Sequence, residues 1–192
     1  MHARVTTFTS KPDQADEGAR TFQDGIPAIR DLDGFKDAVL LMDRQSGKAM
    51  TIALWDNRQA LEGSAPAARD LFQKAAHTIE GEPQRQVYDV LEHRSGQNRT
   101  FARVSTGTVQ PSFFDSRDTS IIDAASQQPG YAGFLMISNR ESNTLMGISF
   151  WDSKDHLEAS ESGYYTREMN KSRDQFEGGQ WSRDVYEVTA QS

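Results

Sequence analysis

The sequence predicts an α+β protein built from two βαββαβ repeats whose sheets pack against each other as one intramolecular α+β barrel. Three observations predict it. The 192-residue chain contains an internal repeat, each copy shows the same order of strands and helices, and the helices of each copy cover only one face of its sheet. The other face must be buried, and a second copy provides the cover.

The internal repeat is visible without gaps when residues 34–64 are set against 130–160, an offset of 96. Ten of these 31 positions are identical, whereas chance similarity of two ordinary α/β stretches would give about two. The match returns at 87–90 against 185–188 and at 3–5 against 102–104. We therefore predict two ferredoxin-like domains, 1–94 and 98–192, joined by the polar, turn-rich segment 93–99. The identical pairs are Gly34/Gly130, Arg44/Arg140, Ser46/Ser142, Met50/Met146, Ile52/Ile148, Trp55/Trp151, Asp56/Asp152, Leu61/Leu157, Glu62/Glu158 and Ser64/Ser160.

The first half of each copy reads as strand, helix and hairpin. Residues 5–9 and 102–109 are rich in β-branched side chains, which favour strands. Polar stretches with spaced apolar residues predict amphipathic helices at 14–31 and 114–127. Residues 35–44 and 48–55 form a predicted hairpin with Gly47 in the turn, and Asn143 takes the equivalent place in the second copy.

The second half of each copy reads as helix and final strand. Asp56 and Asp152 directly follow a tryptophan and are predicted to cap helices 57–78 and 154–177. Gly81 in the first copy and Gly178 with Gly179 in the second end these helices. The final strands are predicted at 86–92 and 181–189.

Composition excludes several classes of function. A net charge of −7 opposes binding to phosphate backbones, so no nucleic-acid partner is expected. The absence of cysteine removes disulfides, thiol catalysis and Cys-ligated metals. No apolar stretch approaches the ~18 residues of a membrane span, and residues 1–9 have no signal-peptide core, so we expect a cytoplasmic protein without membrane contact.

No cofactor is predicted either. The four histidines, His2, His77, His93 and His156, show no metal-ligand spacing on a shared helix or strand. There is no Gly-rich phosphate loop, P-loop lysine or nucleophile elbow.

Trp55 and Trp151 are the leading candidates for a binding site. Strand alternation places small residues on the same face as each tryptophan, and small side chains beside an indole can leave a cavity for a flat aromatic ligand. The alternative is that both tryptophans simply fill the end of a core. Gly147 replaces Thr51 in the second copy and removes volume beside Trp151, which favours the C-terminal half as the one with a cavity.

Five further residues complete the candidate site. Arg4 and Arg103 lie at matching positions on the first strands and are suited to orienting a phenolate, although a salt-bridged structural arginine is the plainer interpretation. Tyr164 and Tyr165 offer ring stacking in the helix after Trp151. His156 in the same helix is a candidate base, with an exposed helix histidine as the alternative.

The motifs of each copy resemble a known family. They are Gly-Phe or Gly-Tyr before a strand, an arginine at the hairpin turn, a strand ending in Trp-Asp, and a helix opening with Leu-Glu-x-Ser. This pattern is similar to the antibiotic biosynthesis monooxygenase-like domains of the dimeric α+β barrel superfamily. The resemblance implies a fused pseudo-dimer, with further homodimerisation left open. It also implies a cofactor-independent monooxygenase acting on a small aromatic, phenolic molecule. The candidate catalytic residues, His156 and Arg103, come from their positions in this sequence rather than from the resemblance.

The sequence departs from that pattern at two places in each copy. Thr51 and Gly147 stand where catalytic relatives often have an asparagine, and Ser64 and Ser160 stand where a helix histidine is expected. The missing histidine argues against haem ligation. The alternative function is therefore a non-catalytic small-molecule-binding or structural barrel of the same superfamily.

Overall fold

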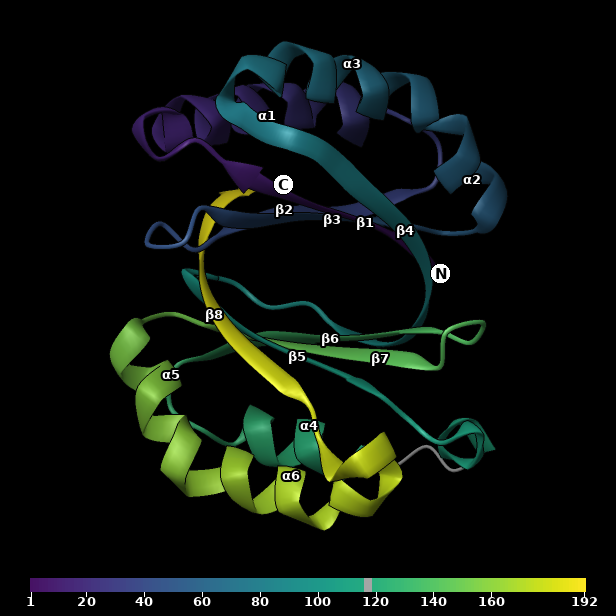
Figure 1. Cartoon of the computed structure of the whole chain (residues 1–192), viewed down its shortest axis with the longest axis vertical. Helices are drawn as coiled ribbons and strands as arrows, with labels where there is room; N and C mark the ends of the chain where they lie inside the picture. Colours follow the sequence, from purple (N-terminus) through teal and green to yellow (C-terminus); the bar gives the residue numbers. More distant parts are fainter. Residues whose placement is uncertain (116–118) are drawn as a thin grey trace. The chain divides into compact units, whose positions relative to one another are not determined.

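A computed structural model describes residues 1–115 and 119–192. The chain forms two compact units (Figure 1). Unit 1 comprises Met1–Asp89 together with Glu187–Ser192, and unit 2 comprises Val90–Tyr186. Strands β4 (Ile79–Arg94) and β8 (Ser182–Gln191) each contribute residues to both units. The repeat boundaries 1–94 and 98–192 divide the sequence rather than these units, and they stay a prediction.

Both units follow the predicted order of elements. Unit 1 contains β1 (His2–Ser10), α1 (Ala15–Arg30), β2 (Phe35–Met42), β3 (Lys48–Trp55), α2 (Arg58–Gly63) and α3 (Ala65–Ala75), with short 3-10 turns at Pro12–Gln14 and Ala76–Thr78. Unit 2 contains β5 (Phe101–Thr108), α4 (Ser120–Ser126), β6 (Tyr131–Asn139), β7 (Thr144–Trp151), α5 (Lys154–Ser160), a π-helical turn (Glu161–Tyr165) and α6 (Thr166–Lys171), with 3-10 turns at Pro111–Asp115, Arg173–Gln175 and Glu177–Gly179.

The strands form a closed barrel in the order β1-β3-β2-β8-β5-β7-β6-β4. Equivalent pairs have the same register in the two units, because His2 opposes Trp55 in β1/β3 and Phe101 opposes Trp151 in β5/β7. The predicted α+β class and intramolecular barrel are thereby confirmed.

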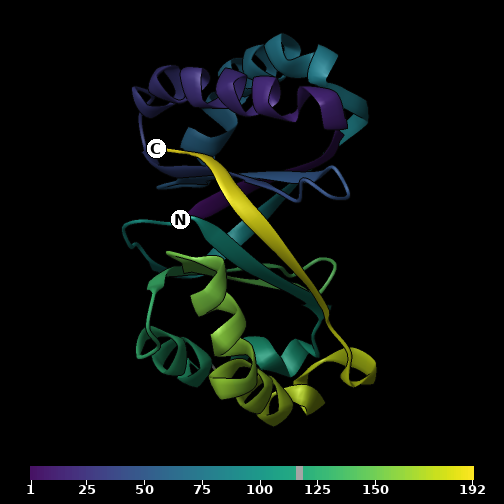
Figure 2. The same cartoon turned by 90° about the vertical axis from the view of Figure 1, so that its left-hand side faces the viewer.

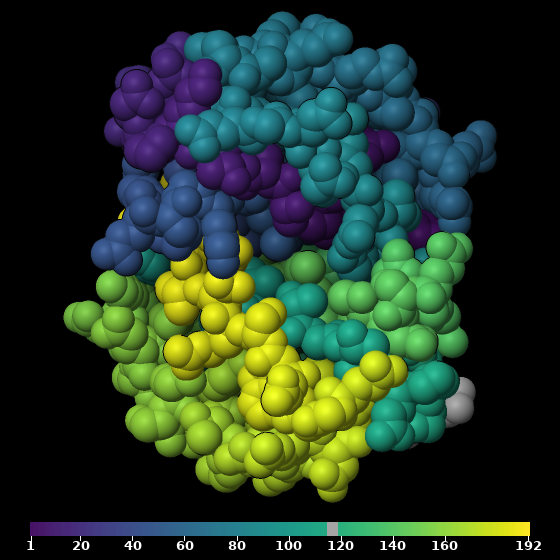
Figure 3. Space-filling view, in the orientation of Figure 1, coloured from purple at the N-terminus to yellow at the C-terminus, as the bar shows by residue number. Residues whose placement is uncertain are grey.

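Each unit buries an apolar core between its helices and one face of its strands (Figure 2). In unit 1 the rings of Phe8, Phe22 and Phe72 form a closed trio with centroids 5.1–5.7 Å apart. In unit 2 the core contains Trp151, Tyr164 and Phe176. The segment that follows α6 also covers part of the surface of that unit (Figure 3). Rings of this size supply most of the apolar area that holds such small sheets to their helices.

The hairpin prediction is confirmed in both units. Gly47 has φ 73° and Asn143 has φ 51°, which are left-handed values that glycine and asparagine tolerate best. The hairpin of unit 1 closes through the Asp43 amide, which donates to the Lys48 carbonyl at 2.8 Å.

The prediction that Asp56 and Asp152 cap the following helices is wrong. The capping residues are Asn57, whose side chain accepts from the Ala60 amide at 2.9 Å, and Ser153, whose hydroxyl accepts from the His156 amide at 3.3 Å. The two aspartates remain bound to the sheet edge, since the Asp56 amide donates to the Gly34 carbonyl and the Asp152 amide to the Gly130 carbonyl. Helix α2 therefore begins at Arg58, one residue later than expected, whereas α5 begins at Lys154 as expected.

The long predicted helices are also interrupted. Helix 57–78 is divided at Ser64 into α2 and α3, and helix 154–177 is divided into α5, the π-helical turn and α6. Of the predicted helix 114–127, the structure shows α4 at Ser120–Ser126, while 116–118 lie outside the described residues. Within the described part of the chain, no helix combines the length and apolarity needed to cross a membrane.

Candidate functional site

Unit 2 contains a cavity of about 60 Å³ between its helices and the face of β7 that packs against them. Gly147 and Ser149 lie on that face because strand side chains alternate. A methyl group added at Gly147 would meet only the tip of Phe134, at 3.5 Å, so the glycine keeps this side of the cavity open. Tyr164 and Tyr165, from the π-helical turn, line the opposite wall.

Hydroxyl groups, together with the Gln175 amide, supply the polar side-chain atoms that line this cavity. The Tyr165 and Ser105 hydroxyls lie 2.7 Å apart, and the Ser149 hydroxyl accepts from the Trp151 indole at 3.0 Å. Burial raises the pKa of Tyr164 to about 12 and also raises the pKa of Tyr165. Both phenols therefore stay protonated near neutral pH, and they are hydrogen-bond donors rather than bases.

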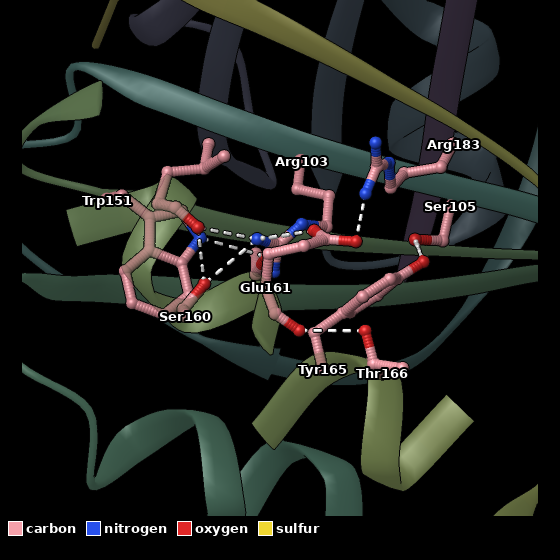
Figure 4. A network of polar contacts seen from close by, with 10 residues as sticks. Arg103, Ser105, Trp151, Ser160, Glu161, Tyr165, Thr166 and Arg183 are labelled. Carbon is pink, nitrogen blue, oxygen red and sulfur yellow. Dashed lines mark hydrogen bonds and ion pairs between the residues drawn. The ribbon is translucent and has the colours of Figure 1, made fainter. Parts of the chain in front are cut away.

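Arg103 supports this wall from behind (Figure 4). Its side chain is only 1% exposed, and Nη2 donates to the Leu157 carbonyl at 2.6 Å and to the Ser160 hydroxyl at 2.9 Å. The guanidinium lies 4.3 Å from the centre of the Tyr165 ring. Burial lowers the pKa of Arg103, but a guanidinium keeps its charge in proteins.

Glu161 completes the support by joining two arginines. One carboxylate oxygen lies 3.1 Å from Nη2 of Arg103, and the other pairs with Arg183 on β8 (Figure 4). The Glu161 carbonyl accepts from the Thr166 hydroxyl at 2.8 Å, so the same residue also closes the π-helical turn. Because this turn carries Tyr164 and Tyr165, the Arg103–Glu161–Arg183 cluster fixes the position of the cavity wall.

Unit 1 has an equivalent cavity, but the polar side chains around it differ from those in unit 2. Its cavity, about 50 Å³, is lined by Trp55, Arg4 and Thr6 among others. Arg4 donates to the Ser64 hydroxyl at 2.8 Å and to the Leu61 carbonyl, as Arg103 does to Ser160 and Leu157. The Trp55 indole N–H is buried without a hydrogen-bond partner, because Ala53 replaces the serine that Trp151 uses, and the Thr6 hydroxyl is also buried without a partner.

The structure brings some of the predicted site residues together and separates others. Tyr164, Tyr165 and Gly147 line the cavity of unit 2, and Trp55 and Arg4 line that of unit 1. Trp151 is fully buried behind Tyr164, with ring centroids 6.1 Å apart, and Arg103 lies behind Tyr165. These two residues reach the cavity of unit 2 only through the tyrosines.

His156 lies away from the cavity. Its Nδ1 is 2.7 Å from an Asp152 oxygen and 3.0 Å from the Ser153 hydroxyl, and its side chain is 43% exposed. It is not among the described residues that line either cavity. The role of a base stays a prediction that this geometry does not support.

Sequence reasoning missed the partners of the arginines. Ser64 and Ser160 appeared only as replacements for a histidine, although both are identical in the repeat and follow the identical leucines whose carbonyls bind Arg4 and Arg103. The repetition of an arginine and a serine at matching positions in both copies was the signal that could have predicted these contacts. Glu161 and Ser105 carried no such signal, because their counterparts in the first copy differ.

No metal centre is evident from the side chains. Across residues 1–115 and 119–192, no group of three or more His, Asp and Glu side chains is arranged to hold a metal ion.

Comparison with known proteins agrees with this architecture. The family model for antibiotic biosynthesis monooxygenase matches residues 1–65. An uncharacterized protein of Mycobacterium tuberculosis is 26% identical over 82% of this chain and 70% of its own length. A candidate monooxygenase from Fusobacterium nucleatum has a TM-score of 0.75 at 15% identity, covering 97% of this chain and 90% of that one. An anthrone oxidase-like protein has a TM-score of 0.63 at 14% identity, covering 100% and 92%.

The closed barrel has the architecture of the dimeric α+β barrel class, with both halves of the barrel in one polypeptide. Within that class, the resemblance to antibiotic biosynthesis monooxygenase-like proteins is confirmed.

Proposed function

We propose that the cavity of unit 2 binds a small aromatic molecule with a phenolic hydroxyl, and that the protein oxygenates this molecule without a resident cofactor. One observation carries the proposal. The cavity is apolar apart from hydroxyl groups and the Gln175 amide, and its two tyrosines are protonated at neutral pH, with pKa values that burial raises further. Such a site stacks an aromatic ring and donates hydrogen bonds to an oxygen that becomes negatively charged.

The reaction draws its electrons from the substrate. An activated aryl methylene and one O₂ give a ketone and one water, so no external reductant is needed. The substrate first loses a proton, and its anion then reacts with oxygen. Tyr165 donates to the anionic oxygen, and the charge of Arg103, 4.3 Å from the Tyr165 ring, strengthens that donor.

The lining limits the substrate class. Among the described residues around this cavity there is no Asp, Glu, His or Lys, so the released proton passes to water. Without a base from the protein, only substrates acidic enough to lose a proton to water, aided by the hydrogen bond from Tyr165, are suitable. Hydroxylated anthrones fit this requirement. A ring also needs more room than about 60 Å³, since a cavity of about 150 Å³ holds one benzene. Met136 and Met169, two flexible lining side chains, are suited to giving way.

A second candidate function, binding without turnover, is favoured by the same lack of a base at the cavity. The departures at Thr51 and Gly147 from the family pattern agree with it. Oxygen consumption distinguishes the two functions.

The test uses 1,8-dihydroxyanthrone as the probe, with its binding followed by tryptophan fluorescence and its turnover by O₂ uptake. We expect one O₂ consumed per ketone formed. Tyr165→Phe should lower kcat about 100-fold, which is typical for the loss of one oxyanion donor.

The matched control is Tyr88→Phe, which removes a buried tyrosine hydroxyl from unit 1 and should leave kcat within about twofold of the parent. Binding without O₂ uptake would favour the second function. No binding of the probe would overturn both.

A further inference from the structure

We propose that unit 1 contains a site for a small aromatic carboxylate, held between Arg4 and Arg85 with its ring against Phe72. The site is separate from the reaction proposed for unit 2 and does not depend on it. The ion-pair cluster of unit 2 and its counterpart in unit 1 differ by one carboxylate.

The pair of arginines is repeated along the sequence. Arg4 corresponds to Arg103 on the first strand of each copy. Arg85 corresponds to Arg183, since the alignment of 87–90 with 185–188 extends two residues towards the N-terminus. Each unit therefore has one arginine on its first strand, β1 or β5, and a second arginine on β4 or β8.

In unit 2 a carboxylate occupies the space between the two arginines. Glu161 contacts Arg103 at 3.1 Å and pairs with Arg183 (Figure 4). The residue after the shared serine is Glu161 in this copy and Ala65 in the other. Unit 1 thus keeps the two cations and lacks the anion that joins their counterparts.

The geometry of unit 1 places its arginines on one face. Arg85 opposes Thr6 in the β1/β4 register, and Arg4 is two residues from Thr6, so all three side chains project from the same side of the strands. The guanidinium of Arg85 lies 5.2 Å from the centre of the Phe72 ring. Burial lowers the pKa of Arg4, and the like charge of Arg85 lowers it further, which indicates that the two cations act on each other.

The neighbouring carboxylates are directed elsewhere. Asp70 pairs with Lys74 at 2.7 Å and Glu62 with Arg58 at 2.9 Å. Glu80 and Glu82 alternate with the residues of β4 that line the groove beside Arg85. In the described part of the chain, neither Arg4 nor Arg85 makes an ion pair, although the protein carries a net charge of −7.

The surrounding space sets the class of ligand. A groove of about 190 Å³ runs beside Arg85 and is lined by Arg69, Phe72 and Ile79. Phe72 also lines the apolar cavity of unit 1, and Arg4 lines that cavity rather than the groove, so Phe72 is shared by the two spaces. Two guanidinium groups bind a carboxylate well, and the groove is larger than the roughly 150 Å³ that holds a benzene ring. An aromatic acid satisfies both features.

The experiment compares benzoate with its neutral analogue benzamide by isothermal titration calorimetry at low salt. We expect the parent protein to bind benzoate at least tenfold more tightly than benzamide. Ala65→Glu supplies the carboxylate that unit 2 has and should weaken benzoate binding at least tenfold. Ala65→Gln, the neutral control of the same size, should keep the parent affinity within about twofold.

A second pair of variants assigns the site to one unit. Arg85→Gln should abolish benzoate binding, whereas Arg183→Gln should leave it unchanged, and circular dichroism checks that both variants fold. Equal affinity for benzoate and benzamide, equal affinities in Ala65→Glu and Ala65→Gln, or loss in Arg183→Gln alone would overturn the proposal. Chloride or phosphate binding as tightly as benzoate would show an unspecific anion contact and would also overturn it.

Discussion

Arg4 and Arg103, the equivalent arginines of the two copies, make the same hydrogen bonds but have different charged neighbours. Each crosses from its strand to the serine and the leucine carbonyl at the end of the first helical segment after the tryptophan. Arg103 is 1% exposed and paired with Glu161, whereas Arg4 has no carboxylate partner among the described residues. The shared hydrogen bonds maintain the fold, and the differing charges set what each unit can bind.

Tyr164 gives a prediction on pH. Its pKa is raised from 10.0 to about 12 by burial, so the folded protein holds this proton where the unfolded chain has lost it. The stabilisation is complete below pH 10 and is lost as the pH rises towards 12. Over that window we expect a loss of about 2–3 kcal/mol in the free energy of unfolding attributable to this residue.

Urea unfolding of the parent and of Tyr164→Phe between pH 9 and pH 12 measures this loss. The variant should show a flatter decline than the parent, since phenylalanine has no proton to lose. Parallel declines in the two proteins would contradict the raised pKa.

At the scale of elements, the junction between the Gly-Tyr turn and α5 is tightly packed. Gly130 has φ +74°, and a methyl group there would approach His156 Nδ1 to 2.2 Å. The same glycine accepts a hydrogen bond from the Asp152 amide at 2.9 Å. The conserved spacing of glycine, Trp-Asp and helix in both copies is therefore explained by contact between turn and helix.

Gly130→Ala should destabilise unit 2 by about 3 kcal/mol or more, combining backbone strain with the clash against His156. Gly81→Ala is the matched control, because Gly81 has φ +67° but nothing within 4 Å of an added methyl group. That variant should lose only about 1–2 kcal/mol. Thermal unfolding of both variants measures the two losses of stability. Equal losses would show that backbone strain alone, without the contact to His156, accounts for the effect.

At the scale of the whole molecule, chain connectivity links the two units. The last six residues, Glu187–Ser192, belong to unit 1, although the rest of β8 belongs to unit 2. Ala190 opposes Leu40 and is 3% exposed, and Glu187 pairs with Arg44 at 2.7 Å. Unit 1 is thus completed by the far end of the chain.

Deleting residues 187–192 should therefore destabilise unit 1 by about 3 kcal/mol or more, because several backbone hydrogen bonds and the burial of Ala190 are lost together. Fluorescence of Trp55 in a Trp151→Phe, Trp181→Phe background reports on unit 1 alone. The control replaces Glu187 by Gln in the full-length chain and should cost less than about 1 kcal/mol, since this ion pair is exposed. An unchanged midpoint of unfolding of unit 1 after the deletion would contradict the assignment of residues 187–192 to that unit.

The sequence by itself determined the repeat, the order of elements, the hairpin residues Gly47 and Asn143, and the barrel class, because identity between copies and side-chain periodicity are local properties of the chain. It also selected Gly147, Tyr164 and Tyr165, which do meet at one cavity. Only the tertiary structure decided that Trp151 and Arg103 lie behind those tyrosines and that His156 lies outside. It alone revealed Glu161 between two arginines far apart in sequence. The reason is physical: periodicity specifies which face of an element a residue occupies, whereas the depth of a side chain and its ionic partner depend on how helices pack on the sheet.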